Sequence, residues 1–295
     1  MPLSHLHPSV RDIVVREKGE RIKWLKEPRW IGYPKAQEIL AKLDDLLHHP
    51  RVSRMPNMLL VGATNNGKTE IVKHFARQHL ASENPGGEHI VAPVIYVESP
   101  PSPSEGGFYS EILTGLFETV PASSVDAKRA KVVHILGEIQ VKVLIIDELH
   151  NMLAGASVGQ HKFLNMIKYL SNKLQISIVG CGTGDLLRAV SVDPQIQNRF
   201  IPEVLSAWRM NSEYRQLLAS FESLLPLKEQ SKIYDPVLAG KILAMTEGSI
   251  GEISSLLNSA AIYAVEKGKE KISDKILDGC DYTPPSDRKL KASRV

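Results

Sequence analysis

The chain has 295 residues, of which 43% are hydrophobic and 23% are charged, and its formal net charge is +3. These values fit an ordinary globular protein with a sizeable core and exclude the disordered and fibrous classes. No apolar run approaches the roughly 20 residues of a membrane-spanning helix, and the first residues lack the layout of a secretion signal. The two cysteines, Cys181 and Cys280, provide no disulfide framework, so we expect a protein of the reducing cytoplasm with no membrane partner.

Helical and strand-like patterns alternate over the first two thirds of the chain. Apolar residues recur at helical spacing over residues 36–47, and the apolar run 58–61 stops at Gly62, as expected of a strand buried on both faces. The other predicted elements are a helix at 69–80, a strand at 91–97, helices at 109–117 and 127–139, a strand at 143–146, a helix at 160–173 and a strand at 176–179. This alternation predicts an α/β fold, with a parallel sheet covered by helices on both faces.

Beyond about residue 206 the strand patterns stop. Only helical patterns follow, at 213–225, 236–246 and 251–267. We therefore expect four parts, which are a basic N-terminal segment at 1–28, an α/β core at 29–206, a small all-helical lid at 207–283 and a basic tail at 284–295. The two basic ends either contact phosphate backbones or acidic partners, or they are simply solvated, and the sequence leaves these alternatives open.

The loop after the first predicted strand matches the phosphate-binding pattern G-x-x-x-x-G-K-[ST] at every fixed position. Its residues are Gly62, Ala63, Thr64, Asn65, Asn66, Gly67, Lys68 and Thr69, and Glu70 follows in the predicted helix. Glycines let backbone N–H groups curl around phosphates, and the next helix adds donors and a favourable dipole at its N-terminus. We expect Lys68 to reach the β- and γ-phosphates of ATP and the Thr69 hydroxyl to bind Mg²⁺.

A second motif lies further along the chain, where the apolar run 143–146 ends in Asp147 and Glu148. A buried apolar strand rarely ends in adjacent carboxylates unless a cation or a reaction uses them. We assign Asp147 to Mg²⁺ and Glu148 to the general base that activates the attacking water. His150 completes an Asp-Glu-Leu-His string like that of helicases, but those enzymes need two such cores and this chain has room for one.

Two other classes of P-loop protein fit less well. The nearest string to the Asn-Lys-x-Asp guanine reader of GTPases, at 172–175, ends in glutamine and lies in a helical pattern. A small-molecule kinase usually lacks a catalytic glutamate beside the Mg²⁺ acid and needs no helical lid of this length. The motifs therefore favour ATP hydrolysis.

Features beyond Glu148 resemble those of AAA+ ATPases. The strand at 176–179 leads to Thr183, which corresponds to the sensor that holds the attacking water in that family. Arg199 stands where the family places its arginine finger, which reaches the γ-phosphate in a neighbouring subunit, and Arg188 is the rival candidate. Glu252 lies near the position where many members carry a second sensor arginine, so no arginine is carried over there.

More specific strings resemble the TniB/TnsC family of AAA+ transposition ATPases. They are RWIGYP at 29–34, RMPN at 54–57, DELH at 147–150 and DPQIQNRF at 193–200, and the resemblance extends over 29–267. By this resemblance, Ile31 and Tyr33 would lie beside the adenine. Loops that face the oligomer axis would touch DNA phosphates, and the candidate basic cluster is formed by Lys128, Arg129 and Lys131.

The resemblance also implies a function. With ATP and Mg²⁺, such a chain forms a homo-oligomer, as a ring or a helical filament, on double-stranded DNA of almost any sequence. The oligomer recruits or activates a DDE transposase, in some systems through a TniQ-type targeting protein, and ATP hydrolysis controls its disassembly. The alternatives are a helicase loader or replication-initiation AAA+ ATPase, and an ATP-dependent protein scaffold that acts without DNA.

Overall fold

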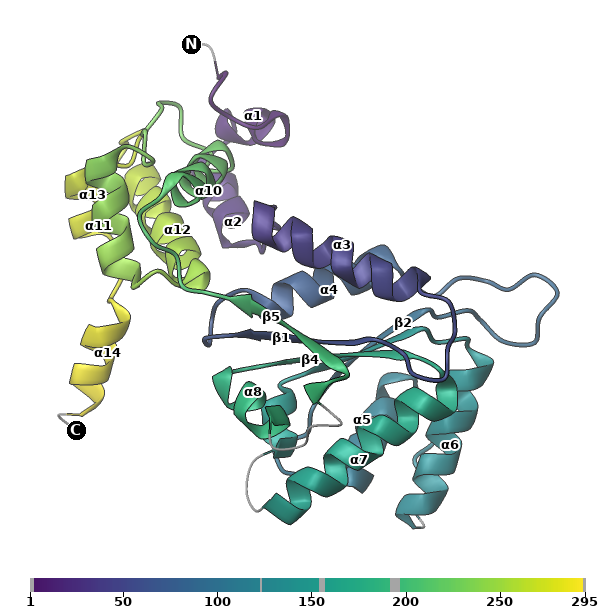
Figure 1. Ribbon diagram of the computed structural model, residues 1–295. Helices are drawn as coiled ribbons and strands as arrows, with labels where there is room; N and C mark the ends of the chain where they lie inside the picture. The colour runs from purple at the N-terminus through teal and green to yellow at the C-terminus, as the bar shows by residue number, and fades with distance from the viewer. Residues whose placement is uncertain (1–2, 123, 154–156, 192–196, 294–295) are drawn as a thin grey trace. The chain divides into compact units, whose positions relative to one another are not determined.

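The computed structural model describes residues 3–122, 124–153, 157–191 and 197–293 (Figure 1). Residues 193–196, which belong to the family string at 193–200, lie outside this described part. The chain divides into two compact units, an α/β unit at Lys35–Leu205 and a helical unit made of Met1–Pro34 and Ser206–Val295. None of the described helices combines the length and apolarity that crossing a bilayer demands.

The α/β unit is built on a parallel sheet with the strand order β2-β3-β4-β1-β5. Its strands are β1 (Asn57–Gly62), β2 (Val94–Glu98), β3 (Val143–Asp147), β4 (Ser177–Gly182) and β5 (Phe200–Leu205). Every residue of β1, β3 and β4 is buried, as expected of central strands covered on both faces. The predicted parallel sheet is thus confirmed.

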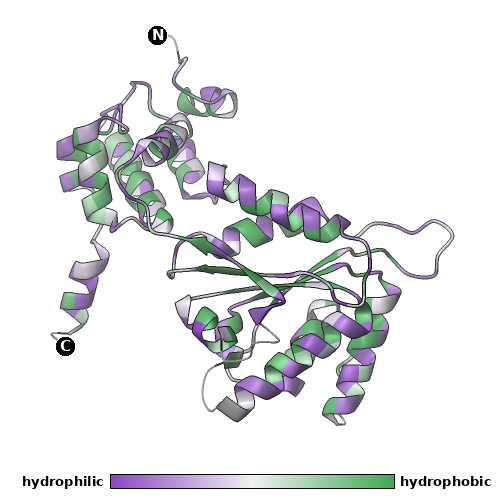
Figure 2. Ribbon diagram, in the orientation of Figure 1, coloured by the Kyte–Doolittle hydropathy of each residue, from purple (hydrophilic) through white to green (hydrophobic). Residues whose placement is uncertain are grey.

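Helices cover both faces of this sheet (Figure 1). On one face lie α3 (Pro34–His48) and α4 (Lys68–Gln78), and on the other lie α5 (Glu105–Gly115), α6 (Val125–Glu138), α7 (Ser157–Leu174) and α8 (Gly184–Ser191). A short 3₁₀ helix, η1 (Leu149–Leu153), follows β3. In Figure 2 the turns of α3 alternate between hydrophilic and hydrophobic colours, and its buried residues are spaced to face the sheet.

The strand β5 is the one strand of the sheet that the sequence patterns did not predict. Its sequence FIPEVL carries a proline and a glutamate, and its outward residues are exposed. Both features suit an edge strand, where a proline removes no ladder hydrogen bond. Glu203 is nevertheless buried, and its carboxylate forms ion pairs with Lys35 at 3.0 Å and Lys42 at 2.6 Å. These two lysines of α3 therefore attach β5 to the helix that covers it.

In its described residues, the helical unit contains five helices from the C-terminal third of the chain and two from its start. They are α10 (Ser212–Ser223), α11 (Pro236–Thr246), α12 (Ile250–Glu266), α13 (Asp274–Gly279) and α14 (Pro285–Ala292), with α1 (Pro8–Val14) and α2 (Lys18–Lys26). Residues 1–34 group with 206–295, whereas the sequence led us to set 1–28 apart and to assign 29–34 to the core. The patterns in α1 and α2 are too short to predict this packing.

Arg21 explains why the N-terminal segment joins the helical unit. Its side chain is buried and donates to the Pro226 carbonyl at 3.1 and 2.6 Å and to the Glu270 carboxylate at 3.1 and 2.6 Å. These contacts join α2 to two loops more than two hundred residues away in sequence. Part of what the sequence presents as a basic surface segment is therefore an internal ion pair.

Replacing Arg21 by methionine leaves the Glu270 carboxylate with only the exposed Lys228 ammonium, at 3.6 Å, as a cation partner. We expect the free energy of unfolding of the helical unit to fall by about 3 kcal/mol. Burial alone raises the pKa of Glu270, but the hydrogen bonds from Arg21 and from the Lys228 amide outweigh it and lower the pKa below its ordinary 4.5. This contribution to stability is present above that pH and is lost as the pH falls through the lowered pKa.

Urea unfolding of the parent and of Arg21→Met, from neutral pH into acid, measures both effects. The two proteins should differ most at neutral pH and converge in acid. Arg16→Met is the matched control, because Arg16 makes only an exposed 3.9 Å pair with Glu20. A loss of stability in the control as large as in Arg21→Met would contradict the assignment.

Candidate functional site

The phosphate-binding loop joins the end of β1 to the start of α4, and its two glycines have separate structural reasons. A Cβ atom on Gly62 would lie 2.9 Å from the Leu205 carbonyl oxygen, so β1 and β5 can approach only without a side chain here. Gly67 is the N-cap of α4 and has φ 85°, a left-handed conformation that favours glycine. The first N–H groups of α4 therefore face the loop, as an anion-binding helix N-terminus requires.

The other loop residues differ in burial. Ala63, Thr64 and Asn65 are exposed, as is Glu70 in the first turn of α4. Asn66 is buried, and its side-chain amide donates to the Leu205 carbonyl at 2.8 Å. The loop is thus held to the end of β5 from inside, while its outer part is open to a ligand.

Lys68 is buried, and its ammonium donates to two carbonyl oxygens of its own loop, those of Gly62 at 2.9 Å and Ala63 at 2.8 Å. Burial lowers the pKa of Lys68, and the nearby charges of Glu148 and Asp147 oppose that shift. A phosphate oxygen would compete well for this ammonium, because a charged acceptor binds more strongly than a carbonyl.

The Asp147 carboxylate ends β3 and is almost fully buried. Its Oδ2 accepts the Thr69 hydroxyl at 2.8 Å and the Tyr96 hydroxyl at 3.0 Å, and its Oδ1 accepts the Glu148 backbone N–H at 2.9 Å. The structure therefore brings together Thr69 and Asp147, the two residues that we assigned to Mg²⁺. Their oxygen donors fit a hard divalent cation.

No group of three or more His, Cys, Asp or Glu side chains among the described residues could hold a metal ion alone. A cation at Thr69 and Asp147 would thus need phosphate oxygens and water as its remaining ligands, which is how Mg²⁺ is usually bound with nucleotides.

Glu148 follows in a left-handed conformation with φ 52°. This conformation costs a non-glycine residue about 1 kcal/mol or more and is found preferentially at functional sites. It turns the partly exposed side chain away from the strand direction, and Glu148 Oε2 lies 3.2 Å from His150 Nδ1. His150 is therefore a neighbour of the general-base candidate.

Thr183 comes directly after β4, whose Gly182 is paired in register with Val61 at the end of β1. The Thr183 hydroxyl oxygen is buried and has no hydrogen-bond partner among the described residues. A buried hydroxyl without a partner is costly unless a ligand or water completes it. Thr183 lies at the carboxyl ends of the strands, as the phosphate loop does, and this position fits the predicted contact with an attacking water.

Arg199 lies at the amino ends of the strands, on the opposite side of the sheet from the carboxyl ends where the phosphate loop lies. It precedes β5, whose Phe200 pairs with Asn57 at the start of β1, whereas the phosphate loop follows the end of β1. At about 3.3 Å per residue, β1 separates the two positions by about 16 Å. Arg199 donates to Asn172 at 2.8 Å and cannot serve the phosphates bound to its own loop.

Arg188, the rival candidate, lies on α8 after the carboxyl end of β4. Its guanidinium is 80% exposed and forms an ion pair with Asp185. It is held less firmly than Arg199, whose Nε is buried.

The three basic residues assigned to DNA lie on α6 and have partners within the chain. Arg129 forms ion pairs with Glu105 at 2.5 Å and Asp126 at 2.7 Å, Lys131 pairs with Glu118 at 3.0 Å, and Lys128 donates to Ser110 at 3.0 Å. The charges of Arg129 and Lys131 are thus compensated, and the DNA contact of this cluster stays a prediction.

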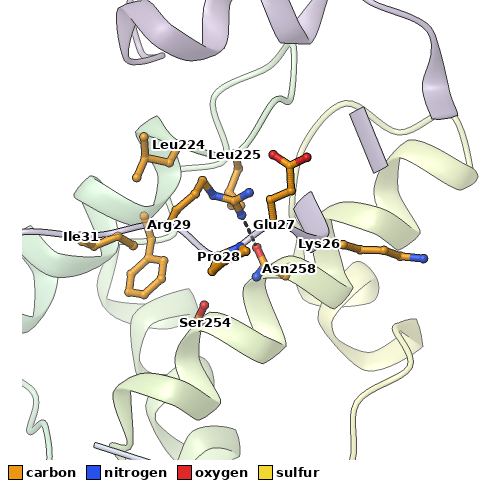
Figure 3. Close-up of a pocket in the computed structure, with 10 residues that line it drawn as sticks. Lys26, Glu27, Pro28, Arg29, Ile31, Leu224, Leu225, Ser254 and Asn258 are labelled. Carbon is orange, nitrogen blue, oxygen red and sulfur yellow. Dashed lines mark hydrogen bonds between the residues drawn. The ribbon is translucent and has the colours of Figure 1, made fainter. Parts of the chain in front are cut away.

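The residues assigned to adenine lie in the helical unit. Tyr33 is buried, its ring packs edge-on against Trp208 at 5.3 Å, and burial raises its pKa to about 12. Ile31 lines a cavity of about 180 Å³ together with Arg29 and Asn258, whose side chains are joined by a 3.0 Å hydrogen bond (Figure 3). Apolar side chains and polar groups both line this cavity.

Glu252, which the sequence led us to place near the expected second sensor position, is also buried in the helical unit. It accepts the Tyr282 hydroxyl at 2.8 Å and pairs with Arg288 of α14. The predicted basic tail is therefore a helix held by an acidic residue of α12, with a second contact from the Ser286 N–H to Glu247 at 2.8 Å.

Sequence reasoning missed Tyr96 as a neighbour of the site and gave no structural reason for Asn57. The sequence VIYVE of β2 does not alternate between polar and apolar residues, so no local signal shows that the Tyr96 hydroxyl reaches Asp147. Asn57 is buried in β1, donates to Met55 and accepts the Ile178 N–H at 2.7 Å, so it fixes the start of β4 against β1. The RMPN string therefore has a structural reason for its asparagine.

The family model described as Bacterial TniB protein matches residues 21–210. No curated protein sequence matches the chain.

Solved structures are similar in fold. The Aeropyrum pernix ORC1 protein in complex with DNA has a TM-score of 0.61 and 16% identity, with 92% of this chain and 69% of that chain covered. Cdc6p from Pyrobaculum aerophilum has a TM-score of 0.58, 18% identity and coverages of 85% and 68%. The Aeropyrum pernix ORC2 protein, in ADPNP–ADP complexes, has a TM-score of 0.57, 17% identity and coverages of 92% and 72%. At these identities the likeness shows the fold, that of AAA+ P-loop ATPases.

Gly62→Ala tests the loop geometry. The added methyl group meets the Leu205 carbonyl at 2.9 Å, so we expect a loss of about 2 kcal/mol in the free energy of unfolding and at least tenfold weaker ATP binding. Denaturant unfolding and calorimetric titration with ATP measure the two effects. Gly159→Ala on α7 is the control, because a Cβ there meets nothing within 4 Å. Equal behaviour of the two variants would contradict the close approach of β1 and β5.

Proposed function

Because the chain belongs to the bacterial TniB family and is an AAA+ ATPase, we propose that it is an ATP-dependent regulator of DNA transposition. In this role it assembles on double-stranded DNA and recruits or activates a DDE transposase, with a TniQ-type targeting protein as a further candidate partner. The observation that carries the proposal is the group formed by Lys68, Thr69, Asp147 and Glu148 in a chain whose family match covers residues 21–210.

The chemistry of the site follows from its own residues. The loop N–H groups and the Lys68 ammonium bind the phosphates, and Lys68 gives up its two loop carbonyls to do so. Thr69 and Asp147 would hold the magnesium that accompanies the nucleotide, and the ion would supply positive charge to the phosphates. Glu148 accepts the proton of the attacking water, and the Thr183 hydroxyl orients that water.

The sheet geometry supports a site that two protomers share. The phosphate loop lies at the carboxyl ends of the strands and Arg199 lies at their amino ends. One chain therefore cannot supply both to one nucleotide. In a head-to-tail homo-oligomer, Arg199 of one protomer would reach the nucleotide of the next. Such an interface forms rings when the rotation closes and helical filaments when it does not.

Binding to DNA in this proposal depends on phosphate contacts, which tolerate sequence and weaken with salt. The family match and the ORC1 relative, which was solved in complex with DNA, support it. Lys128, Arg129 and Lys131 remain the proposed contacts, although Arg129 would have to exchange two carboxylate partners for phosphates. The alternatives remain a helicase loader and a scaffold that acts without DNA.

Lys68→Ala should abolish ATP-dependent binding to duplex DNA, because the phosphates lose their cation. Glu148→Gln should instead hold an ATP-bound assembly on DNA, because the proton acceptor is removed while the binding residues stay. Electron microscopy with ATP, with and without duplex DNA, shows both outcomes, and the exposed Lys162→Ala is the control.

Rings or filaments around DNA that need Lys68 support transposition regulation. Oligomers of the parent that ignore DNA favour the scaffold, and capture of a purified replicative helicase favours the loader. DNA binding by Lys68→Ala equal to that of the parent would contradict nucleotide-driven assembly.

Arg199→Ala should lower the rate of ATP hydrolysis about a thousandfold while ATP binding persists. Mixing it with Glu148→Gln should restore part of the activity, since the intact Glu148 of one protomer then meets the intact Arg199 of another. Arg188→Ala, which removes an exposed residue, should leave hydrolysis near the parent rate. Two inactive variants that stay inactive when mixed would contradict the shared site.

A further inference from the structure

Tyr96 contacts the nucleotide site without belonging to any motif. It lies in the middle of β2, paired in register with Ile145 of β3, two residues before Asp147. Residues at this spacing on neighbouring strands project from the same face of the sheet. The phenol therefore lies beside the Asp147 carboxylate, and its hydroxyl donates to Oδ2 at 3.0 Å.

We propose that Tyr96 is a positioning residue that holds the Asp147 carboxylate in the orientation from which it serves the magnesium of a bound nucleotide. This role rests on the proposed function, since it requires that the nucleotide enter together with magnesium.

The three donors around Asp147 carry this role. Glu148 N–H holds Oδ1, and the hydroxyls of Thr69 and Tyr96 share Oδ2. Thr69 must also offer its oxygen to the metal, and Glu148 belongs to the reacting part of the site. Tyr96 is the donor with no second task, so it can keep the carboxylate from rotating while the others change partners.

Helix α4 contacts both Asp147 and Tyr96. Thr69 contacts Asp147 from the first turn of the helix, and Lys73, one turn later, places its ammonium 5.2 Å from the centre of the Tyr96 ring. A cation over an aromatic face is attractive and draws electron density from the ring, which strengthens the phenol as a donor. Lys73 thus contacts the face of the Tyr96 ring, while the Tyr96 hydroxyl contacts Asp147.

Core packing alone does not require a hydroxyl at this position. Tyr96 belongs to an edge strand and is only partly buried. Its ring lines an open groove of about 430 Å³ together with Lys73, Leu116 and Phe117. A phenylalanine would keep the ring, the groove wall and the contact with Lys73, and would remove only the hydrogen bond to Asp147.

Tyr96→Phe is therefore the test, with binding of a fluorescent, slowly hydrolysed ATP analogue as the readout during a titration with Mg²⁺. We expect the half-saturating Mg²⁺ concentration to rise about tenfold, which corresponds to about 1.4 kcal/mol. Binding in excess EDTA should match the parent, whereas the melting temperature without nucleotide should fall slightly, because a buried carboxylate loses one donor. Lys73→Met should shift the titration in the same direction by about threefold.

Tyr109→Phe is the matched control, because it also removes a tyrosine hydroxyl that donates to a carboxylate, that of Glu105, at 3.0 Å. Its Mg²⁺ dependence should stay that of the parent. An unchanged Mg²⁺ dependence in Tyr96→Phe, or an equal shift in Tyr109→Phe, would overturn the positioning role. If the parent itself bound the analogue equally well in EDTA and in Mg²⁺, the proposed magnesium site would fail, and the role of Tyr96 with it.

Discussion

The nucleotide site depends on one buried carboxylate, that of Asp147. A carboxylate removed from water is unfavourable unless donors replace its lost hydration. Here a backbone N–H from the same turn, a hydroxyl from α4 and a hydroxyl from β2 supply that replacement. These donors come from three separate elements, so the carboxylate also ties the start of α4 and the edge strand to the centre of the sheet.

The two ends of the parallel strands carry different parts of the proposed site. Because all five strands run the same way, Gly62, Asp147 and Thr183 lie together at the carboxyl ends of the strands. Arg199 lies at their amino ends. Within a single chain, Arg199 lies far from the loop that we expect to bind the phosphates. In the proposed function this geometry links hydrolysis to assembly, since the site is complete only when a neighbour contributes its arginine.

The helical unit pairs charges that the sequence alone does not show as paired. From the sequence, the basic residues at both ends of the chain either contact phosphates or acidic partners or are simply solvated. Arg21 is instead buried against Glu270, and Arg288 pairs with Glu252. In the α/β unit, Arg129 of α6 is also paired, with Glu105 and Asp126, and the DNA contact of this helix stays a prediction. Such pairs neutralise charges that a count along the sequence leaves free.

The sequence by itself determined the parallel α/β core, the phosphate loop and the pair Asp147–Glu148. Local rules are enough for these, because a buried strand is a continuous apolar run and the loop chemistry needs glycines and a lysine at fixed spacing. Only the tertiary structure decided that β5 completes the sheet, that residues 1–34 join the helical unit, and that Tyr96 donates to Asp147. Each of these depends on contacts between residues distant in sequence, and neither periodicity nor motif spacing records which distant side chains meet.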